Sequence, residues 1–389
     1  MHYNKLTYGI LSSLILLSNS VIAAEYLVDA DLSPTLRYDD NVELREDKEG
    51  SFSTEITPTL FLSRATEDTF LGLDAGYRIE KFTSLEELDR QDPFLLFSSS
   101  ATRERSEFGL DAEYSQRAQR TIAAEDTGDF ASDATVTTRS IAPRYQYQLS
   151  ARDFLYTNLS YQDRSYDDNE FLDNETFVIT GGWRRNFTER LTGGLALTYI
   201  DYEAEAIDRT SEYDSYNLNV TSTYRLSELW SFAGQVGYRT LDSENSNING
   251  FTAKDTSSGS LFSFSAIYEG YLNNISIEIS KALNPSGEGV VNEQESISVD
   301  WQRQIASRLD FGFKASFQKT TSASDFDNTD RDYMTFSPSL RWRVEENITL
   351  NLGYQFREQD EKGDTVRKAE SNMVFLTLNY DWGGLLYSR

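Results

Sequence analysis

The stretch Leu350-Asn351-Leu352-Gly353-Tyr354-Gln355-Phe356-Arg357 decides the fold, because every second side chain is apolar or aromatic and the others are polar or small. In a β-strand successive side chains point to opposite faces, so this segment has one apolar and one polar face. In a soluble sandwich the apolar face turns inward, whereas in an outer-membrane barrel it turns outward to lipid. The rest of the sequence distinguishes these two arrangements.

Segments with the same alternation recur along the chain from about Leu27 to Trp382. They predict about eighteen strands, within a range of 16 to 18. An even number of strands is typical of single-chain bacterial barrels. The predicted strand centres lie near Leu32, Thr57, Ala75, Phe97, Leu110, Arg144, Leu159, Ile179, Ala196, Val220, Val236, Phe264, Ile277, Val299, Phe313, Pro338, Leu352 and Leu376.

The connectors between these segments are of two kinds, which alternate along the chain. The short kind has the residue types of tight turns and comprises 65–68, 151–153, 188–190, 227–228, 306–308 and 345–347. The long kind is acidic and rich in Asn, Ser and Gly, as in 39–50, 120–133, 242–259 and 321–332. Short turns at one end and long loops at the other are typical of outer-membrane barrels. We therefore predict an all-β protein, an antiparallel up-and-down barrel in the outer membrane.

Both ends of the chain agree with this prediction. Residues 1–24 have the pattern of a cleaved secretory signal, with Lys5, a short apolar stretch at 10–17 and small residues before Glu25. The domain prediction is a signal peptide over 1–24 and a single barrel over 25–389. Near the C-terminus, apolar residues alternate from Val374 to Trp382, similar to the terminal strand by which outer-membrane barrels are recognised. We expect export to the outer membrane of a Gram-negative bacterium.

Composition excludes several functions. The chain has no Cys, and its single His is His2, inside the signal. The mature protein therefore lacks the residues of Ser-His-Asp or Cys-His catalysis and of ordinary zinc sites. A net charge of −27 is unsuited to nucleic acid, and no glycine motif for nucleotides is present. We expect no enzymatic activity, no catalytic residues and no cofactor. A calcium site in the acidic segment 325–330 stays open as a minor alternative.

If the apolar residues face lipid, the alternate residues line the lumen. The pore-lining candidates are Arg37, Arg78, Arg144, Arg184, Arg225, Arg239, Arg341, Arg343, Arg357, Asp74, Asp111, Glu113, Asp300 and Asp310. These charges either contact a hydrophilic solute or pair across strands and stabilise a hydrated wall. For a single residue the second interpretation is favoured. Eighteen strands nevertheless enclose an interior too wide for side chains to fill, so an aqueous passage is expected unless something plugs it.

A short motif near the start of the barrel is similar to the start of a known family, and it reads Leu32-Ser33-Pro34-Thr35-Leu36-Arg37-Tyr38-Asp39-Asp40-Asn41. Part of this motif recurs in the second predicted strand, as Ile56-Thr57-Pro58-Thr59-Leu60. Together with the barrel pattern it resembles the type 2 family of β-barrel porins associated with exopolysaccharide synthesis and export. The resemblance implies a passive conduit for a secreted polysaccharide that works with periplasmic export components. It implies no catalytic or binding residues.

Three functions remain open. The first is an exopolysaccharide-export pore, and the second is a general or solute-selective diffusion porin. Diffusion porins usually carry one long loop folded inward, and no connector here clearly dominates the others in length. The third is a structural or adhesive surface barrel, for which hydrophobic outer loops would be expected. In each case the partners are outer-membrane lipid outside the barrel and, for the two pores, a hydrophilic solute or polysaccharide inside it.

Overall fold

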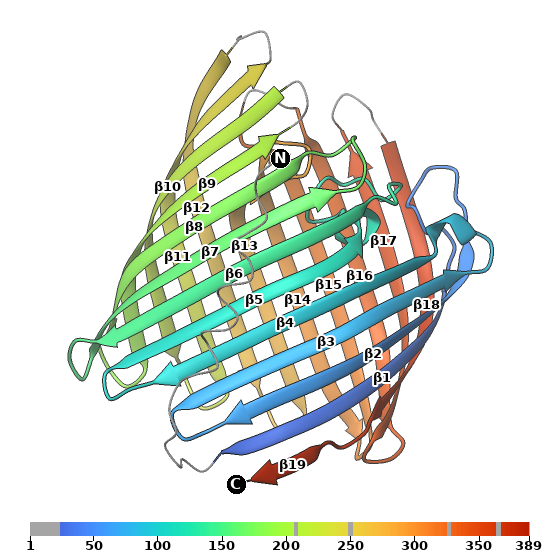
Figure 1. The fold of residues 1–389 in the computed structure, drawn as a ribbon, viewed down its shortest axis with the longest axis horizontal. Helices are drawn as coiled ribbons and strands as arrows, with labels where there is room; N and C mark the ends of the chain where they lie inside the picture. Colours follow the sequence, from blue (N-terminus) through green and yellow to red (C-terminus); the bar gives the residue numbers. More distant parts are fainter. Residues whose placement is uncertain (1–23, 206–208, 248–251, 325–327, 363–366, 389) are drawn as a thin grey trace, which may run out of the picture.

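The computed structural model describes residues 24–205, 209–247, 252–324, 328–362 and 367–388, so all but the last residue of the predicted signal, 1–24, lies outside the described residues. Each of the strands β1 to β17 pairs antiparallel with the next one along the chain. The ring closes where β1 pairs with β18, from Asp31 opposite Asp381 to Asp39 opposite Met373. The protein is thus a closed antiparallel barrel of eighteen strands (Figure 1), which confirms the predicted fold class.

All eighteen predicted strand centres fall inside successive strands of the barrel. The bounds are β1 Glu25–Asp39, β2 Ser51–Ala65, β3 Thr69–Phe82, β4 Arg90–Thr102, β5 Ser106–Ala118, β6 Thr135–Gln148, β7 Asp153–Tyr166, β8 Asp173–Asn186, β9 Leu191–Glu205, β10 Arg209–Arg225, β11 Trp230–Asn247, β12 Thr252–Glu269, β13 Asn273–Pro285, β14 Val291–Ala306, β15 Leu309–Ser322, β16 Asp330–Arg343, β17 Ile348–Glu361 and β18 Arg367–Asp381.

The alternation in sequence becomes two faces of the barrel wall. On β10, Tyr216, Leu218 and Val220 are 56%, 54% and 52% exposed on the outer surface. The intervening Asn217 and Asn219 point to the other side and are buried. An apolar band outside a polar interior is the arrangement that lipid requires of a spanning barrel.

In the part of the chain that the structure describes, helix is confined to two short pieces, the 3₁₀ turn η1 (Glu86–Leu88) and the helix α1 (Gln119–Ile122). No helix among the described residues is long and apolar enough to cross a membrane.

The connectors alternate as predicted, with the tight turns at one end of the barrel and the longer segments at the other (Figure 1). The predicted long connector 321–332 is correct in its central part, and only its ends belong to β15 and β16. The predicted long connector 242–259 is largely wrong, because β11 continues to Asn247 and β12 begins at Thr252. Thr256, for example, donates a hydrogen bond to Asp242 across two paired strands at 2.8 Å. Beyond the lipid both faces of a strand meet water, so pairing continues after the apolar alternation has ended.

The C-terminal segment forms an additional short strand that the alternation did not indicate. After β18 the chain turns at Gly383 and Gly384, which both have positive φ angles of 80° and 60°. Strand β19 (Leu385–Ser388) then pairs antiparallel with Glu25–Val28 of β1. This part of β1 extends past the end of β18, and β19 covers the edge that would otherwise be free.

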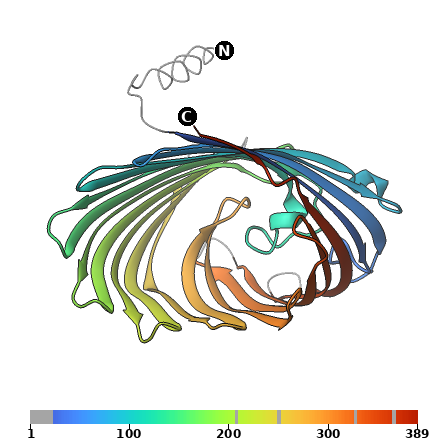
Figure 2. The same ribbon diagram turned by 90° about the horizontal axis from the view of Figure 1, so that it is seen from below.

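Two segments at the long-loop end turn into the barrel, as Figure 2 shows. The first is the connector between β5 and β6, residues 119–134, which we call the inner loop. The second is the outer end of the β13–β14 hairpin, residues 282–291. The absence of a dominant long connector therefore misled the sequence interpretation, because the direction of a loop depends on its contacts with the wall and not on its length alone.

Candidate functional site

The inner loop has a defined internal structure. Its base is closed by a hydrogen bond from the Gln119 amide to the Ala134 carbonyl at 2.8 Å. The Gln119 side chain donates to the Thr127 hydroxyl at 2.8 Å, inside the loop. Gly128 has a φ of 79° and donates its amide to the Ala123 carbonyl at 2.6 Å. Glycine suits this position, because other residues adopt a left-handed conformation at a cost.

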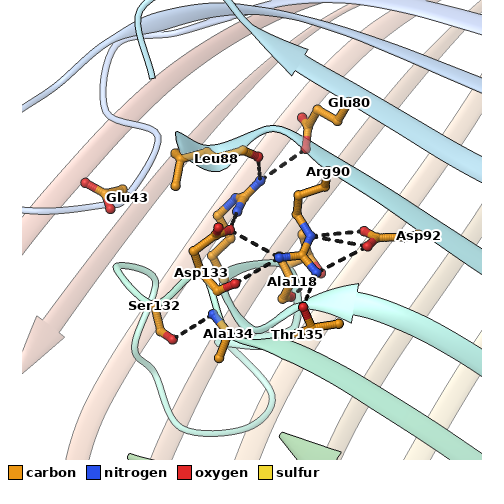
Figure 3. A network of polar contacts seen from close by, with 12 residues as sticks. Glu43, Glu80, Leu88, Arg90, Asp92, Ala118, Ser132, Asp133, Ala134 and Thr135 are labelled. Carbon is orange, nitrogen blue, oxygen red and sulfur yellow. Dashed lines mark hydrogen bonds and ion pairs between the residues drawn. The ribbon is translucent and has the colours of Figure 1, made fainter. Parts of the chain in front are cut away.

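A chain of alternating ion pairs joins the inner loop to the wall formed by β1–β4. The Arg120 guanidinium lies 3.3 Å from the Glu80 carboxylate, contacts Asp133 and donates to the Leu88 carbonyl at 3.1 Å. Figure 3 shows Arg90 between Asp92 and Asp133, each 3.2 Å away. In order, the chain runs Arg78, Glu55, Arg37, Glu80, Arg120, Asp133, Arg90 and Asp92. Arginines and carboxylates are equal in number, so the chain anchors the loop without adding net charge.

A second part of the wall, β16–β17, also holds the inner loop and is separated from β1 by β18 alone. Arg331 of β16 donates to the backbone carbonyls of Thr127 and, at 3.1 Å, Asp126. Gln359 of β17 donates to the Gly128 carbonyl at 2.9 Å. These bonds are made to main-chain oxygens, so they fix the position of the loop backbone. The inner loop is therefore attached to both β1–β4 and β16–β17.

An aromatic contact adds to this attachment. The Phe130 ring of the inner loop stacks on Tyr333 of β16 with 5.4 Å between ring centroids. The Arg357 guanidinium lies 5.8 Å from the centre of the Phe130 ring and bonds to Asp39 at 2.7 Å. Because Asp39 ends β1, this ion pair also spans the closure between β1, β18 and β17.

Asp126 connects the inner loop to the β13–β14 hairpin. Its carboxylate accepts hydrogen bonds from the Gly287 amide at 2.6 Å and from the Tyr166 hydroxyl at 3.0 Å. The side chain of Asn284 donates to the neighbouring Glu125 carbonyl. Asp126 is only 2% exposed. The two inward segments thus meet inside the lumen and form one constriction.

A cavity of about 330 Å³ remains between the inner loop and the wall. Its lining combines charged, hydroxyl and aromatic groups, namely Arg37, Asp39, Val42, Ser51, Ser53, Glu80, Phe82, Arg120, Thr121, Ala124, Phe130, Tyr333, Gln355, Arg357 and Met373. Small apolar clusters lie beside it, where Val42 packs with Phe82, Leu85 and Leu88. The passage is therefore narrowed by folded polypeptide that is packed against the wall.

The predicted pore-lining residues lie in different surroundings. Arg37, Arg78 and Arg357 belong to the constriction, and Arg239 pairs with Glu293 of the hairpin at 3.1 Å. Three further groups of candidates form ion pairs with neighbouring strands, namely Arg144 with Asp111, Arg343 with Asp310 at 3.4 Å, and Asp300 with Lys314 at 3.2 Å. Arg184 donates a hydrogen bond to the side chain of Gln146 at 2.8 Å. No ion pair within the described residues involves Asp74, Glu113, Arg225 or Arg341. Their contact with a solute stays a prediction.

The residues that build the constriction were mostly missed from the sequence. Arg120, Asp126 and Phe130 lie in a connector that was predicted as an outer acidic loop, and Glu80 and Arg331 lie near strand ends where the alternation fades. One signal was present. The loop consists mostly of small and acidic residues but contains an Arg and a Phe, whose side chains are stabilised by ion pairs and apolar contacts with a wall.

The possible calcium segment cannot be placed in full, since residues 325–327 are outside the described residues. Among those that are described, no group of three or more carboxylates is arranged to hold a metal ion.

The closed eighteen-stranded barrel, its apolar outer band, its polar lumen and its inward loop together define the class of protein. The protein has the fold of an outer-membrane β-barrel of the porin type.

No protein-family model matches the chain, and no curated protein matches it in sequence. Among solved structures, the ferric citrate transporter FecA in its unliganded form aligns with a TM-score of 0.52 and 9% identity, over 87% of this chain and 60% of that one. This chain therefore spans less than two thirds of that transporter. OccK2 (OpdF) of Pseudomonas aeruginosa aligns with a TM-score of 0.49 and 13% identity, over 91% of this chain and 98% of that one. At these identities the likeness concerns the fold alone.

Proposed function

We propose that the protein is a diffusion porin for small hydrophilic solutes, with the inner loop as the element that limits solute size. The observation that supports this function is the attachment of the inner loop to two parts of the wall, through Arg120 to Glu80 of β3 and through Arg331 of β16 to the loop backbone. A small solute can pass beside a fixed constriction. A polymer would have to thread every repeat unit past it, so the diffusion porin is favoured over the export pore.

The lumen wall is suited to such solutes. Hydroxyl and amide side chains pair across neighbouring strands, as Ser33 does with Asn379 at 3.0 Å and Thr35 with Thr377 at 2.9 Å. Similar hydroxyl pairs join Ser316 to Thr335 and Thr180 to Thr198. Such groups exchange hydrogen bonds with water and solutes at little cost. The fourteen pore-lining candidates, above all the unpaired Arg225 and Arg341, would then set charge preference.

The test is solute flux through the purified protein in planar bilayers and in liposomes that swell with sugars of increasing size. Replacing residues 121–132 by a short Gly-Ser linker should raise both the conductance and the size limit. A control variant with residues 168–170, which are exposed, replaced by Gly and Ser should behave like the wild type. Absence of any conductance in both variants and the wild type would instead favour a structural barrel.

Export of an exopolysaccharide is the second candidate, supported by the hydroxyl-lined wall and by the resemblance of residues 32–41 to export-associated porins. It would require periplasmic export components and a displaced inner loop. Deleting the gene and measuring released against periplasm-retained polysaccharide separates the candidates, since unchanged release excludes export. For either pore we also propose that residues 1–24 are a cleaved signal and that 25–389 form the mature barrel.

A further inference from the structure

The barrel wall separates between β12 and β13 at the long-loop end. The two strands pair from Glu269 opposite Asn274 up to Phe262 opposite Lys281, and the pairing stops there. Strand β12 nevertheless continues for ten more residues, to Thr252, paired with β11 alone among the described strands. Strand β13 continues to Pro285, paired with β14 alone. Beyond this last pair, toward the long-loop end, the β13–β14 hairpin departs from the wall and turns into the lumen (Figure 2).

The exposed edge of β12 is compatible in register with the outer part of β13, which no longer pairs with it. Continuing the existing register would place Leu261 opposite Ala282 and Gly259 opposite Asn284. These pairs keep the same inward face as Ser263 and Ser280 below them. A long, unpaired sheet edge carries free main-chain donors and acceptors and is a strong template for strand pairing. The hairpin therefore has a second position available, in which it would complete the wall.

The inward position is held by a small set of contacts. Leu283 and Val291 of the hairpin pack with Tyr202, Tyr213 and Leu241 on the inner wall. The Tyr202 hydroxyl donates to the Ser286 carbonyl at 2.6 Å, and the Leu172 amide donates to the Gly287 carbonyl at 2.8 Å.

Part of this contact surface is polar and poorly satisfied. Arg239 pairs with Glu293, but its Nε is buried with no hydrogen-bond partner within the described residues. The Asn292 amide oxygen and the Ser243 hydroxyl, also buried, lack partners there too. Unsatisfied buried polar groups weaken a contact surface. Two positions of comparable free energy are the condition for a switch.

We infer that the outer end of the β13–β14 hairpin is a gate, which constricts the lumen in the position seen and opens it by pairing with β12 over Gly259–Leu261. The outward movement breaks the bond between the Gly287 amide and Asp126, and thereby also removes one support of the inner loop. The inference rests on the proposed channel function, although the movement itself can be measured independently.

The absence of cysteine from the sequence makes disulfide trapping direct. One pair, Ala204→Cys with Gly289→Cys, locks the inward position. A Cβ at residue 289 would lie 3.6 Å from that of Ala204, within the range of disulfides. The other pair, Gly259→Cys with Asn284→Cys, joins residues that face each other only in the outward position. The four single variants and the reduced double variants are the controls, and they also report the strain that a side chain causes at the positive φ of Gly289.

Both pairs should crosslink under mild oxidation in native membranes, as seen by gel mobility. The 204–289 lock should lower the conductance and abolish open steps, and the 259–284 lock should raise the conductance above that of its reduced form. Failure of the 259–284 pair to crosslink while 204–289 does would overturn the inference, as would two complete locks with equal conductance. If crosslinking proceeds as expected but no variant conducts, the proposed channel function fails and the hairpin movement stands.

Discussion

Replacing Arg120 by Gln should weaken the attachment of the inner loop to the β1–β4 wall. The Arg120 side chain is 6% exposed and bonds to Glu80, Asp133 and the Leu88 carbonyl. It also lies 5.4 Å from the centre of the Phe82 ring. No other side chain of the inner loop bonds to a carboxylate of β1–β3 within the described residues. Loss of its charge therefore breaks the link between the loop and β3, while Asp133 still contacts Arg90 of β4.

The free energy lost in this variant depends on the partners that the remaining carboxylates keep. Removing one partner of a buried ion pair typically costs about 3–5 kcal/mol, because the other charge stays buried and unpaired. Here Glu80 keeps Arg37 at 2.9 Å, and Asp133 keeps Arg90 at 3.2 Å. We therefore expect a smaller loss, about 2–3 kcal/mol. At about 1.4 kcal/mol per factor of ten, the ratio of docked to undocked inner loop falls by roughly 30- to 150-fold.

Single-channel conductance and the size limit for sugars measure this change, and both should rise in R120Q. The matched control is R144Q, which breaks an ion pair with Asp111 in which both side chains are nearly half exposed, at 46% and 44%. Exposed pairs contribute about 0–1 kcal/mol, so the control should leave the size limit unchanged. A folded R120Q barrel with wild-type conductance and size limit would refute the proposal that this ion-pair chain holds the constriction.

Three further changes test other parts of the molecule. Gly128→Val should displace the inner loop and raise conductance, because Gly128 has a φ of 79° and a Cβ there would collide with the Arg331 guanidinium; normal conductance would contradict this. The Lys81 ammonium holds the pKa of Asp89, in the loop after β3, below its usual 3.8. A lowered pKa stabilises the folded loop at higher pH, and this effect is lost as pH falls through the folded pKa. The protection factors of the amides of residues 83–89, which are corrected for the intrinsic pH dependence of exchange, should therefore fall in acid. Asp89→Asn should lower them at neutral pH and remove this further fall. Arg341→Glu should shift the reversal potential toward cation preference, and an unchanged potential would remove Arg341 from the permeation path.

Much of the barrel could be predicted because the signal is local. Lipid outside and water inside require opposite side chains at neighbouring positions, so a segment such as 350–357 records its own strand and its own orientation. The same reasoning placed Arg144 and Asp111 on one face, and they do pair across β5 and β6. The prediction weakened where both faces meet water. That is why the outer parts of β11 and β12 were taken for a loop.

The constriction depends on contacts between residues far apart in the chain. Arg331 reaches the inner loop 204 positions away, and Gly287 bonds to Asp126 over 161 positions. Neither contact has a periodic pattern that marks it in advance. The separation of β12 from β13 is likewise invisible in sequence, because both segments alternate normally and only their mutual pairing ends.

The sequence by itself determined where most strands lie, because each strand responds to its own two-sided environment. The alternation of apolar and polar residues, together with the alternating short and long connectors, also predicted a barrel whose apolar face meets lipid. Only the tertiary structure decided what occupies the lumen. The inner loop and the β13–β14 hairpin turn inward because closure of the ring brings arginines, carboxylates and carbonyls from distant parts of the sequence within bonding distance, and that proximity exists only in the assembled barrel.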